Sequence, residues 1–350
     1  MLMRRTARTV ATGACLAAAA MGTAAPAHAA PGWHVVAPGQ SIQAAVDAAR
    51  PGDTVLVLPG TYRESVRVTT PDLTIRGTSA GTTVLTPATP AATDSCAQAG
   101  DGICVSGAAG DRIESLTVTG FAKYGIWATG ADRLTVSHVH ADANGQYGIG
   151  QEKSTRARLT ANQADRNGEA GIFVANTVSE EGGAIDTQGT VISGNTLTGN
   201  HMGVVVRRLR DLTVQGNTIS GNCAGMFLVG DENTPRAGAM TVTGNTVTSN
   251  NAYCAATARL PYVQGAGIVL TGVDDTTLTR NTVTGNVGAS PLSGGIVLFP
   301  SFVGAPSSGN TVQGNTLLHN GPADLADRDH GTGNTFSAND CQVSLPTGRC

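Results

Sequence analysis

Two short stretches, QEK at 151–153 and RRLR at 207–210, concentrate charge in a chain of which only 13% of the residues are charged. Removing the proton beside the carboxylate of a uronate needs a base and a cation that binds the carboxylate. Arg207 or Arg208 could bind that carboxylate, and Lys153 could act as the base if its surroundings favoured the neutral amine. A polysaccharide lyase is therefore one candidate activity.

A glycoside hydrolase is the other candidate activity, and it needs a pair of carboxyl groups. These groups lie about 5 Å apart in enzymes that retain configuration and roughly 6.5–9.5 Å apart in enzymes that invert it. Glu152 could be one member, and Glu180, Glu181 or Asp231 would have to supply the other from a loop. The full set of predicted catalytic residues is Glu152, Lys153, Arg207, Arg208 and Asp231.

These residues lie within a sequence repeat, in which a glycine precedes a short apolar stretch. The repeat reads GIWAT (125–129), GIGQE (148–152), GIFVA (171–175), GVVVR (203–207), GMFLV (225–229), GIVLT (267–271) and GIVLF (295–299). The shortest spacings are 22 and 23 residues, and a period in the twenties is typical of a solenoid. Frequent Gly, Asn and Thr exclude helical repeats. Three short strands fit such a coil, which predicts a parallel β-helix of about ten coils.

Alternation within the seven glycine-led strands predicts which side chains face the interior. The first and third positions after the glycine are apolar in 13 of 14 cases, and successive side chains of a strand point to opposite faces. The second and fourth positions should therefore face outward. They include Trp127, Phe173, Phe227, Glu152 and Arg207.

The predicted outer face is unusually apolar for a surface in contact with water. Sugar rings could stack on it, or insertions of the chain itself could cover it, and the sequence leaves both alternatives open. Insertions fall at 176–189, 230–239, 251–264 and 299–309, and long loops on a rigid scaffold often carry function. If a glycan binds there, the predicted contacts are Trp127, Tyr147, Phe173 and Phe227.

A second repeat, of the form GNTxxxN, places asparagines at two points of the coil. Equivalent residues of neighbouring coils lie about 4.8 Å apart, so stacked amides could form hydrogen-bonded ladders. Asn also tolerates the left-handed backbone of tight turns. One predicted column comprises Asn162, Asn195, Asn217, Asn245, Asn281, Asn315 and Asn334, and the other comprises Asn144, Asn167, Asn200, Asn222, Asn250, Asn286, Asn320 and Asn339.

Residues 1–29 have the pattern of a secretory signal peptide. Three arginines precede an Ala-rich apolar run, and AHA at 27–29 forms a cleavage site. Without this segment the formal net charge changes from −3 to −6, which argues against a nucleic acid partner. The apolar run is too short to span a bilayer, and no later run is long enough. We therefore expect a secreted, extracellular monomer.

Six cysteines remain after residue 29, and an even number in an exported chain indicates disulfides. Proximity in the sequence favours the pairs Cys96–Cys104, Cys223–Cys254 and Cys341–Cys350. No Cys/His spacing typical of a metal site appears. HVH at 138–140 should put two imidazoles on one strand face, but no third ligand is evident. We predict no metal or other cofactor, and calcium binding stays open although no motif indicates it.

The segment SIQAAVDAARPGD (41–53) predicts a short helix over residues 41–50 that closes the first coil. Ser41 is an N-cap candidate, an apolar stripe runs from Ile42 to Ala49, and Pro51 with Gly52 ends the helix. Such a helix covers an end that could otherwise pair with the strands of another chain.

The chain resembles the secreted right-handed parallel β-helix proteins of the pectin-lyase-like superfamily, including the NosD-type repeat group. The resemblance rests on PGQSIQAAVDAARPGDTVLVLPGTYRESVRV (38–68) and on the repeats that continue to about residue 340. It implies this fold, with any activity located in a groove over one column of strands. GTYRE (60–64) is similar to the opening segment of pectin methylesterases. The later segments that hold that family's catalytic acids are absent, as are the signatures of mannuronan epimerases, polygalacturonases and pectate lyases.

The sequence thus predicts a signal peptide at 1–29 and one β-helix domain at 30–350, with a disulfide-closed tail at 341–350. The predicted function is the binding or processing of an extracellular polysaccharide or cell-wall glycan, by a lyase or a glycoside hydrolase activity if the protein is catalytic. A non-catalytic structural or interaction protein of the cell envelope, using the same surface, is the alternative. The sequence does not identify the polysaccharide.

Overall fold

The computed structural model describes residues 30–89, 93–258 and 260–350, and residues 31–350 form one compact unit. The predicted signal peptide, residues 1–29, lies outside the described residues. Among the residues that are described, no helix combines the length and the apolar character needed to cross a membrane.

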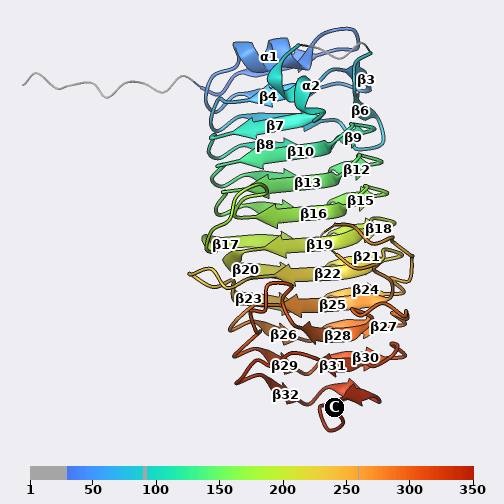
Figure 1. The fold of residues 1–350 in the computed structure, drawn as a ribbon. Coiled ribbons are helices and arrows are strands. Elements are labelled where there is room, and N and C mark those ends of the chain that lie inside the picture. The colour runs from blue at the N-terminus through green and yellow to red at the C-terminus, as the bar shows by residue number, and fades with distance from the viewer. Residues whose placement is uncertain (1–29, 90–92, 259) are drawn as a thin grey trace, which may run out of the picture. The chain divides into compact units, whose positions relative to one another are not determined.

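Three parallel sheets run along the unit, and each coil of the chain adds one strand to each sheet (Figure 1). Sheet A has 12 strands: β1 (Trp33–Val36), β2 (Thr54–Val57), β5 (Thr74–Gly77), β8 (Arg112–Glu114), β11 (Thr135–Ser137), β14 (Arg158–Thr160), β17 (Ile185–Ser193), β20 (Leu209–Gln215), β23 (Gly238–Thr243), β26 (Thr277–Thr279), β29 (Thr311–Gln313) and β32 (Thr335–Ser337). Sheet B has 11: β3 (Gly60–Arg63), β6 (Thr83–Thr86), β9 (Thr117–Thr119), β12 (His140–Asp142), β15 (Gln163–Asp165), β18 (Thr196–Thr198), β21 (Thr218–Ser220), β24 (Thr246–Thr248), β27 (Thr282–Thr284), β30 (Thr316–Leu318) and β33 (Asp340–Cys341). Sheet C also has 11: β4 (Val66–Val68), β7 (Ile103–Ser106), β10 (Tyr124–Thr129), β13 (Tyr147–Glu152), β16 (Ala170–Ala175), β19 (Met202–Arg207), β22 (Ala224–Val229), β25 (Ala266–Thr271), β28 (Gly294–Phe299), β31 (Leu325–Asp327) and β34 (Ser344–Leu345).

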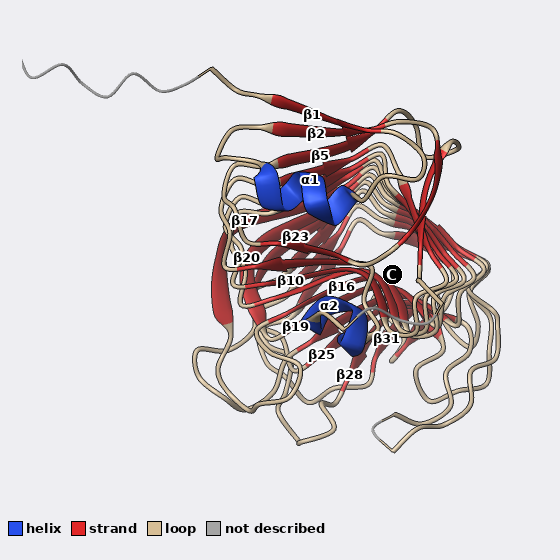
Figure 2. Ribbon diagram, turned by 90° about the horizontal axis from the view of Figure 1, so that it is seen from above, coloured by secondary structure: helices blue, strands red, loops and turns tan. Residues whose placement is uncertain are grey.

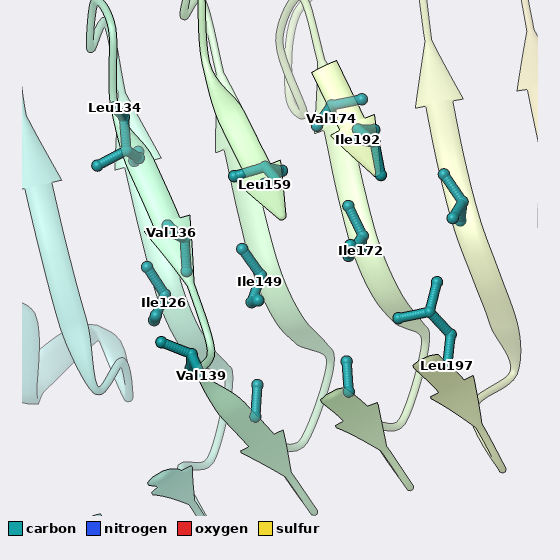
Figure 3. Close-up of a cluster of buried hydrophobic side chains, with 14 of the residues drawn as sticks. Ile126, Leu134, Val136, Val139, Ile149, Leu159, Ile172, Val174, Ile192 and Leu197 are labelled. Carbon is teal, nitrogen blue, oxygen red and sulfur yellow. The ribbon is translucent and has the colours of Figure 1, made fainter. Parts of the chain in front are cut away.

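This architecture is the parallel β-helix that the repeat predicted. The glycine-led strands all belong to sheet C, and the strand numbers slightly exceed the predicted ten or so coils. The coils enclose one continuous apolar core. Ile126, Ile149 and Ile172 are register partners on successive strands and lie in line inside it (Figure 3). Gln151, the one polar residue among the fourteen predicted inward positions, is also buried.

Asparagine ladders connect the coils along the turns that flank the strands of sheet B. Within a ladder, Oδ1 of one Asn accepts hydrogen bonds from the side-chain and the backbone N–H of the Asn one coil earlier. For example, Asn217 donates to Oδ1 of Asn245 through Nδ2 at 2.9 Å and through its backbone N at 3.0 Å. Asn245 is 1% exposed, so each rung satisfies polar groups that water does not reach.

Both predicted asparagine ladders are present, but the last residue assigned to each was wrong. Asn339 continues the column of Asn315, at 3.1 Å from its backbone N, and the other column ends where Asn320 donates to Asp324 at 3.0 Å. Asn334 instead accepts from Asn310, at 3.0 Å, in a separate short ladder. The sequence misleads here because GNT precedes strands of both sheet A and sheet B, so the motif alone does not identify the turn.

The left-handed residue of these turns is not the asparagine, contrary to the prediction. Gly216 and Gly244, which precede Asn217 and Asn245, have φ values of 61° and 63°. No described Asn has a positive φ. The glycine makes the turn, and the asparagine that follows directs its amide inward to the ladder.

The first coil is closed by helix α1 (Ile42–Ala48), within the predicted 41–50 (Figure 1). Ser41 caps it as predicted, accepting from the backbone N of Ala44 at 3.1 Å. The carboxylate of Glu64 accepts hydrogen bonds from the backbone N of Ile42 at 2.7 Å and of Gln43 at 3.0 Å. Glu64 of the GTYRE segment therefore stabilises the N-terminus of α1.

The three favoured disulfides are all present. Cys96–Cys104, Cys223–Cys254 and Cys341–Cys350 have Cα separations of 5.9, 5.9 and 5.3 Å. The first ties a second short helix, α2 (Ser95–Ala99), to β7. The second holds the insertion that follows β24 against the start of β22, and the third closes the C-terminal tail.

Replacing one ladder residue should test how much the stacked amides stabilise the solenoid. Asn245→Ala removes the Oδ1 that accepts a hydrogen bond from Asn217. It also removes the Nδ2 that donates to the carbonyl of Val214 and to Asn281. We expect a loss of roughly 3–5 kcal/mol in the free energy of unfolding, because several buried polar groups lose their partners. Chemical denaturation measures this. Thr246→Val, at the exposed neighbouring position, should change stability by less than about 1 kcal/mol, and an equal loss in both variants would contradict the ladder's role.

Candidate functional site

The outer face of sheet C carries a second apolar cluster, separate from the core inside the coils. Phe173, Phe227 and Val297 belong to it and are 6%, 2% and 0% exposed. Insertions of the chain pack over this face, and Figure 2 shows long loops extending on the side where β19, β25 and β28 lie. Of the two alternatives left open by the sequence, covering by insertions therefore accounts for much of the strip, while Trp127 stays partly exposed.

Four aromatic rings stack on this face, from β10, β13 and β16. Tyr124 and Tyr147, register partners on β10 and β13, have ring centroids 4.8 Å apart, and Tyr147 lies 4.2 Å from Phe173. The indole of Trp127 stacks on Tyr124 at 4.4 Å. Gly150 makes room for that indole, because a Cβ there would lie 2.7 Å from its ring atoms. The stack spans three coils, and of its four rings only Trp127 is partly exposed, because Tyr124, Tyr147 and Phe173 are buried.

Two adjoining chambers follow the stack along sheet C, and we call them together the sheet C groove. The apolar chamber, of about 210 Å³, is lined mainly by side chains of the apolar cluster and by Leu260. The charged chamber, of about 350 Å³, contains Glu180, Glu181, Arg208 and Asp231. Five residues line both chambers: Val178, Arg207, Val229, Thr271 and Phe302.

Most of the predicted catalytic residues hold the insertion at 176–184 against sheet C. Glu152 accepts a hydrogen bond from the backbone N of Val178 at 3.0 Å. Arg207 donates to the carbonyls of Thr177 and Val178 at 3.1 and 3.2 Å. Lys153 pairs with Glu180 at 3.1 Å. The charged side chains that the sequence predicted to be catalytic thus also form hydrogen bonds with the backbone of a loop that has no strand partner.

Arg208 is the centre of the charged chamber. Its guanidinium, 9% exposed, forms ion pairs with both Asp231 and Glu181, whose side chains are 8% and 75% exposed. It also donates to the carbonyl of Glu180 at 3.1 Å. A buried carboxylate and an exposed one therefore share one guanidinium, which holds three segments of the chain together.

The structure brings some predicted residues together and separates others. Arg207, Arg208 and Asp231 line the charged chamber, as does Glu181, which the sequence named as a loop candidate. Glu152 and Lys153 line neither chamber, and among the predicted aromatic contacts Trp127 also lies outside them.

Several residues of this region were missed from the sequence. Tyr124 could have been found, because it precedes GI in its repeat as Tyr147 does in the next. Phe302 and Leu260 come from insertions without periodicity, so no pattern indicated that they turn back onto sheet C.

Burial governs the ionisation of the groups around the aromatic stack. It raises the pKa of Tyr147 and of Tyr124, and nearby Glu169 adds to both effects, so the two phenols stay protonated in the physiological range. Burial also raises the pKa of Asp101 to about 6, against the opposing charge of Lys123. Asp101 accepts a hydrogen bond from the backbone N of Tyr124 at 3.2 Å, which places an ionisable group beneath the stack.

The predicted pair of histidines does not share a strand face. His138 lies in a turn with a φ of 54°, whereas His140 lies on β12 and contacts Asp165 at 3.2 Å. A turn separates them because the strands of this fold are only three residues long here. In the described part of the chain, no group of three or more His, Cys, Asp or Glu side chains is arranged to hold a metal ion.

Comparison with known proteins agrees with this architecture. A family model described as a right handed beta helix region matches residues 94–237 and 184–347. The chain belongs to this right-handed β-helix family. The sequence matches no curated protein.

Solved structures similar to this β-helix protein include enzymes that act on polysaccharides. An alginate lyase from Paenibacillus sp. str. FPU-7 is 16% identical with a TM-score of 0.58, covering 86% of this chain and 99% of its own. The A-module of a mannuronan C-5 epimerase from Azotobacter vinelandii is 17% identical with a TM-score of 0.55, covering 87% and 90%. A pectate lyase is 14% identical with a TM-score of 0.52, covering 90% and 80%. At these identities the likeness shows the fold alone.

Removing Arg208 should destabilise the protein through Asp231. In Arg208→Met the carboxylate of Asp231 stays buried without its cation, and we expect a loss of about 3–5 kcal/mol in the free energy of unfolding. The matched control is Glu181→Gln, which removes the exposed partner of the same guanidinium and should cost less than about 1 kcal/mol. Chemical denaturation measures both. Adding Asp231→Asn to Arg208→Met should restore part of the loss, and no recovery would contradict a buried-charge penalty.

Asp101 should make stability depend on pH. Its folded-state pKa of about 6 lies above the ordinary 3.8, so its protonated form stabilises the fold at low pH, and this contribution is lost as pH rises through 6. We expect Asp101→Asn to gain on the order of 2–3 kcal/mol relative to wild type between pH 4 and pH 8. Thermal or chemical unfolding at both pH values measures the difference. Asp340→Asn, at an exposed position, is the control. The prediction fails if the stability of both variants changes with pH as that of the wild type does.

Proposed function

We propose that the protein is a secreted polysaccharide-binding β-helix protein whose sheet C groove holds an acidic glycan chain. The observation that carries the proposal is the junction of an apolar chamber with a charged one, with Arg207 lining both. Aromatic and aliphatic walls suit the apolar faces of sugar rings. A guanidinium suits a uronate carboxylate, which it can bind through two parallel hydrogen bonds.

The dimensions of the groove suit an oligosaccharide better than a single sugar. Its lining comes from five consecutive strands of sheet C, β13, β16, β19, β22 and β25. Strands of one sheet lie about 4.8 Å apart, so five of them extend over roughly 19 Å. A glycan lying along the groove could therefore contact several coils at once.

The names of the similar structures support the choice of an acidic ligand. One is an alginate lyase, one a mannuronan epimerase and one a pectate lyase. Alginate, mannuronan and pectate are all polyuronates. Polyuronates are therefore the first ligands to test with this chain.

Catalysis is a second candidate, which rests on the two carboxylates in the charged chamber. Glu181 and Asp231 both line it, and a glycoside hydrolase needs such a pair. Both are paired with Arg208, so a substrate would have to displace or share that guanidinium. The competing hypothesis is a non-catalytic protein of the cell envelope, which would bind a glycan without forming products.

Secretion is part of the proposal. The predicted signal peptide at 1–29 motivates it, and three disulfides are typical of proteins that function outside the cytosol.

The test is a binding titration of residues 30–350 with alginate, polygalacturonate and neutral dextran. Phe302→Ala is the informative variant, because Phe302 lines both chambers but is 51% exposed, so its removal should leave the fold intact. We expect affinity for a polyuronate to fall about five- to tenfold. The matched control is Tyr253→Ala, at a 65% exposed aromatic that lines neither chamber, and it should bind as wild type.

The same samples distinguish binding from processing. Unsaturated-product absorbance reports a lyase, and new reducing ends report a hydrolase. Binding without either product would favour the non-catalytic reading. Failure to bind any glycan, or equal affinities of wild type and Phe302→Ala, would overturn the sheet C groove as the binding site.

A further inference from the structure

The outer face of sheet A and the turns that lead into its strands carry a group of arginines. We call it the arginine face; it consists of Arg76, Arg112, Arg133, Arg156 and Arg158. The side chains of the four that form ion pairs are between 47% and 54% exposed. The face lies on a different sheet from the sheet C groove and shares no residue with it.

Register shows that two of these arginines interrupt a regular column. Arg112, Thr135 and Arg158 are partners on β8, β11 and β14. At the same position β1 carries Trp33, and the other eight strands of sheet A carry small β-branched residues: Thr54, Thr74, Val191, Thr213, Thr241, Thr277, Thr311 and Thr335. One strand, β11, lies between Arg112 and Arg158, so their positions are two strand spacings apart, about 9.6 Å. A hydroxyl therefore stands between two guanidinium-bearing positions.

A second pair of arginines borders this column. Arg133 and Arg156 occupy equivalent turns on consecutive coils, with φ values of 55° and 53°. Together with Arg112, Thr135 and Arg158 they line a hollow of about 500 Å³, larger than either chamber of the sheet C groove. The bulge of β17 at Gln188 and Gly189 closes one side of it.

The acids of this face do not balance its cations. Asp132 pairs with Arg133 and Arg156, each at 2.6 Å, and Glu114 pairs with Arg112 at 2.6 Å and with Arg76 at 3.8 Å. Asp72 also lines the hollow. Arg158 has no ion-pair partner among the described residues. Five cations thus face three carboxylates, on a chain whose formal net charge is −3.

Such a face is suited to a polymer with regularly spaced carboxylates. Each guanidinium has five N–H donors, and one carboxylate uses at most two or three of them, so donors remain for a ligand even in the ion-paired arginines. An extended polyuronate presents carboxylates on successive rings and hydroxyls between them. Arg112 and Arg158 could bind two carboxylates, and the Thr135 hydroxyl could bind a ring hydroxyl.

We propose that the arginine face is a second glycan-binding surface, which takes a polyuronate through its carboxylates. The inference rests on the sheet A residues and not on the sheet C groove. A protein with both sites would hold one chain at two places, or two chains at once, and binding would be stronger than at either site alone.

The test measures the number of binding sites as well as affinity, with size-fractionated oligogalacturonate and oligoalginate as probes in isothermal titration. Wild type should show two sites. Arg158→Gln should weaken one of them about tenfold and leave the melting temperature unchanged, because Arg158 has no ion pair to lose within the described residues. Arg112→Gln with Arg158→Gln should abolish that site. Phe302→Ala should affect only the other site.

Controls separate recognition from general charge. Arg166→Gln removes an arginine that is 66% exposed on another face and should bind as wild type, while Arg158→Lys should bind at an intermediate level because it keeps the charge but not the fork of donors. A single site that Phe302→Ala removes and Arg158→Gln does not would overturn this inference and leave the proposed function standing. Equal weakening by Arg166→Gln, or stronger binding of polyphosphate than of the oligouronates, would also overturn it.

Discussion

The constraint on which the rest of this structure depends is the exact register between coils, fixed by buried amides that hydrogen-bond to one another along the stack. An Asn such as Asn217 can satisfy its donors only if Asn245 stands directly beyond it. Sliding one coil by a residue would leave several buried polar groups without partners and would turn inward-facing side chains outward. Register in turn makes every equivalent position a column, so that Ile126, Ile149 and Ile172 pack as one row.

Because equivalent residues of successive coils line up in columns, they form continuous surfaces on the outside of the solenoid as well as in its core. Tyr124 and Tyr147 stack because they are register partners, Phe173 extends the stack on the next strand, and Trp127 joins it because Gly150 leaves space for the indole. Such a surface on sheet C is too apolar to face water along its whole length, and insertions cover part of it. The insertion at 176–184 has no strand partner, so Glu152 and Arg207 supply hydrogen bonds to its backbone. The charges near the groove are thus required by the loops that shape it.

The sequence predicts what is periodic and fails where periodicity ends. Coil length, the inward positions, the capping helix and the disulfide pairs all follow from local patterns, and each is found in the structure. The assignment of Asn334 failed because one motif serves two kinds of turn. The placement of Phe302 and Leu260 could not be predicted, because the path of an insertion depends on tertiary contacts that no repeat records. For the same reason the ion pairs of Arg208 with Asp231 and Glu181 became visible only in three dimensions.

The distribution of insertions also explains why the two proposed binding surfaces differ in character. The insertions that cover sheet C begin after residue 175, whereas the coils between β10 and β16 have spacings of only 23 residues. On the coils before residue 175 the outer face of sheet A stays bare, and it carries Arg112, whose side chain is 51% exposed, and Arg158, which is also exposed. A covered face favours apolar walls with a few buried charges, because desolvated charges need partners. A bare face favours exposed guanidinium groups, whose attraction for an anionic chain extends over a Debye length of about 8 Å at physiological salt. One stack of coils can therefore present an apolar groove on sheet C and a charged surface on sheet A. The same interior supports both.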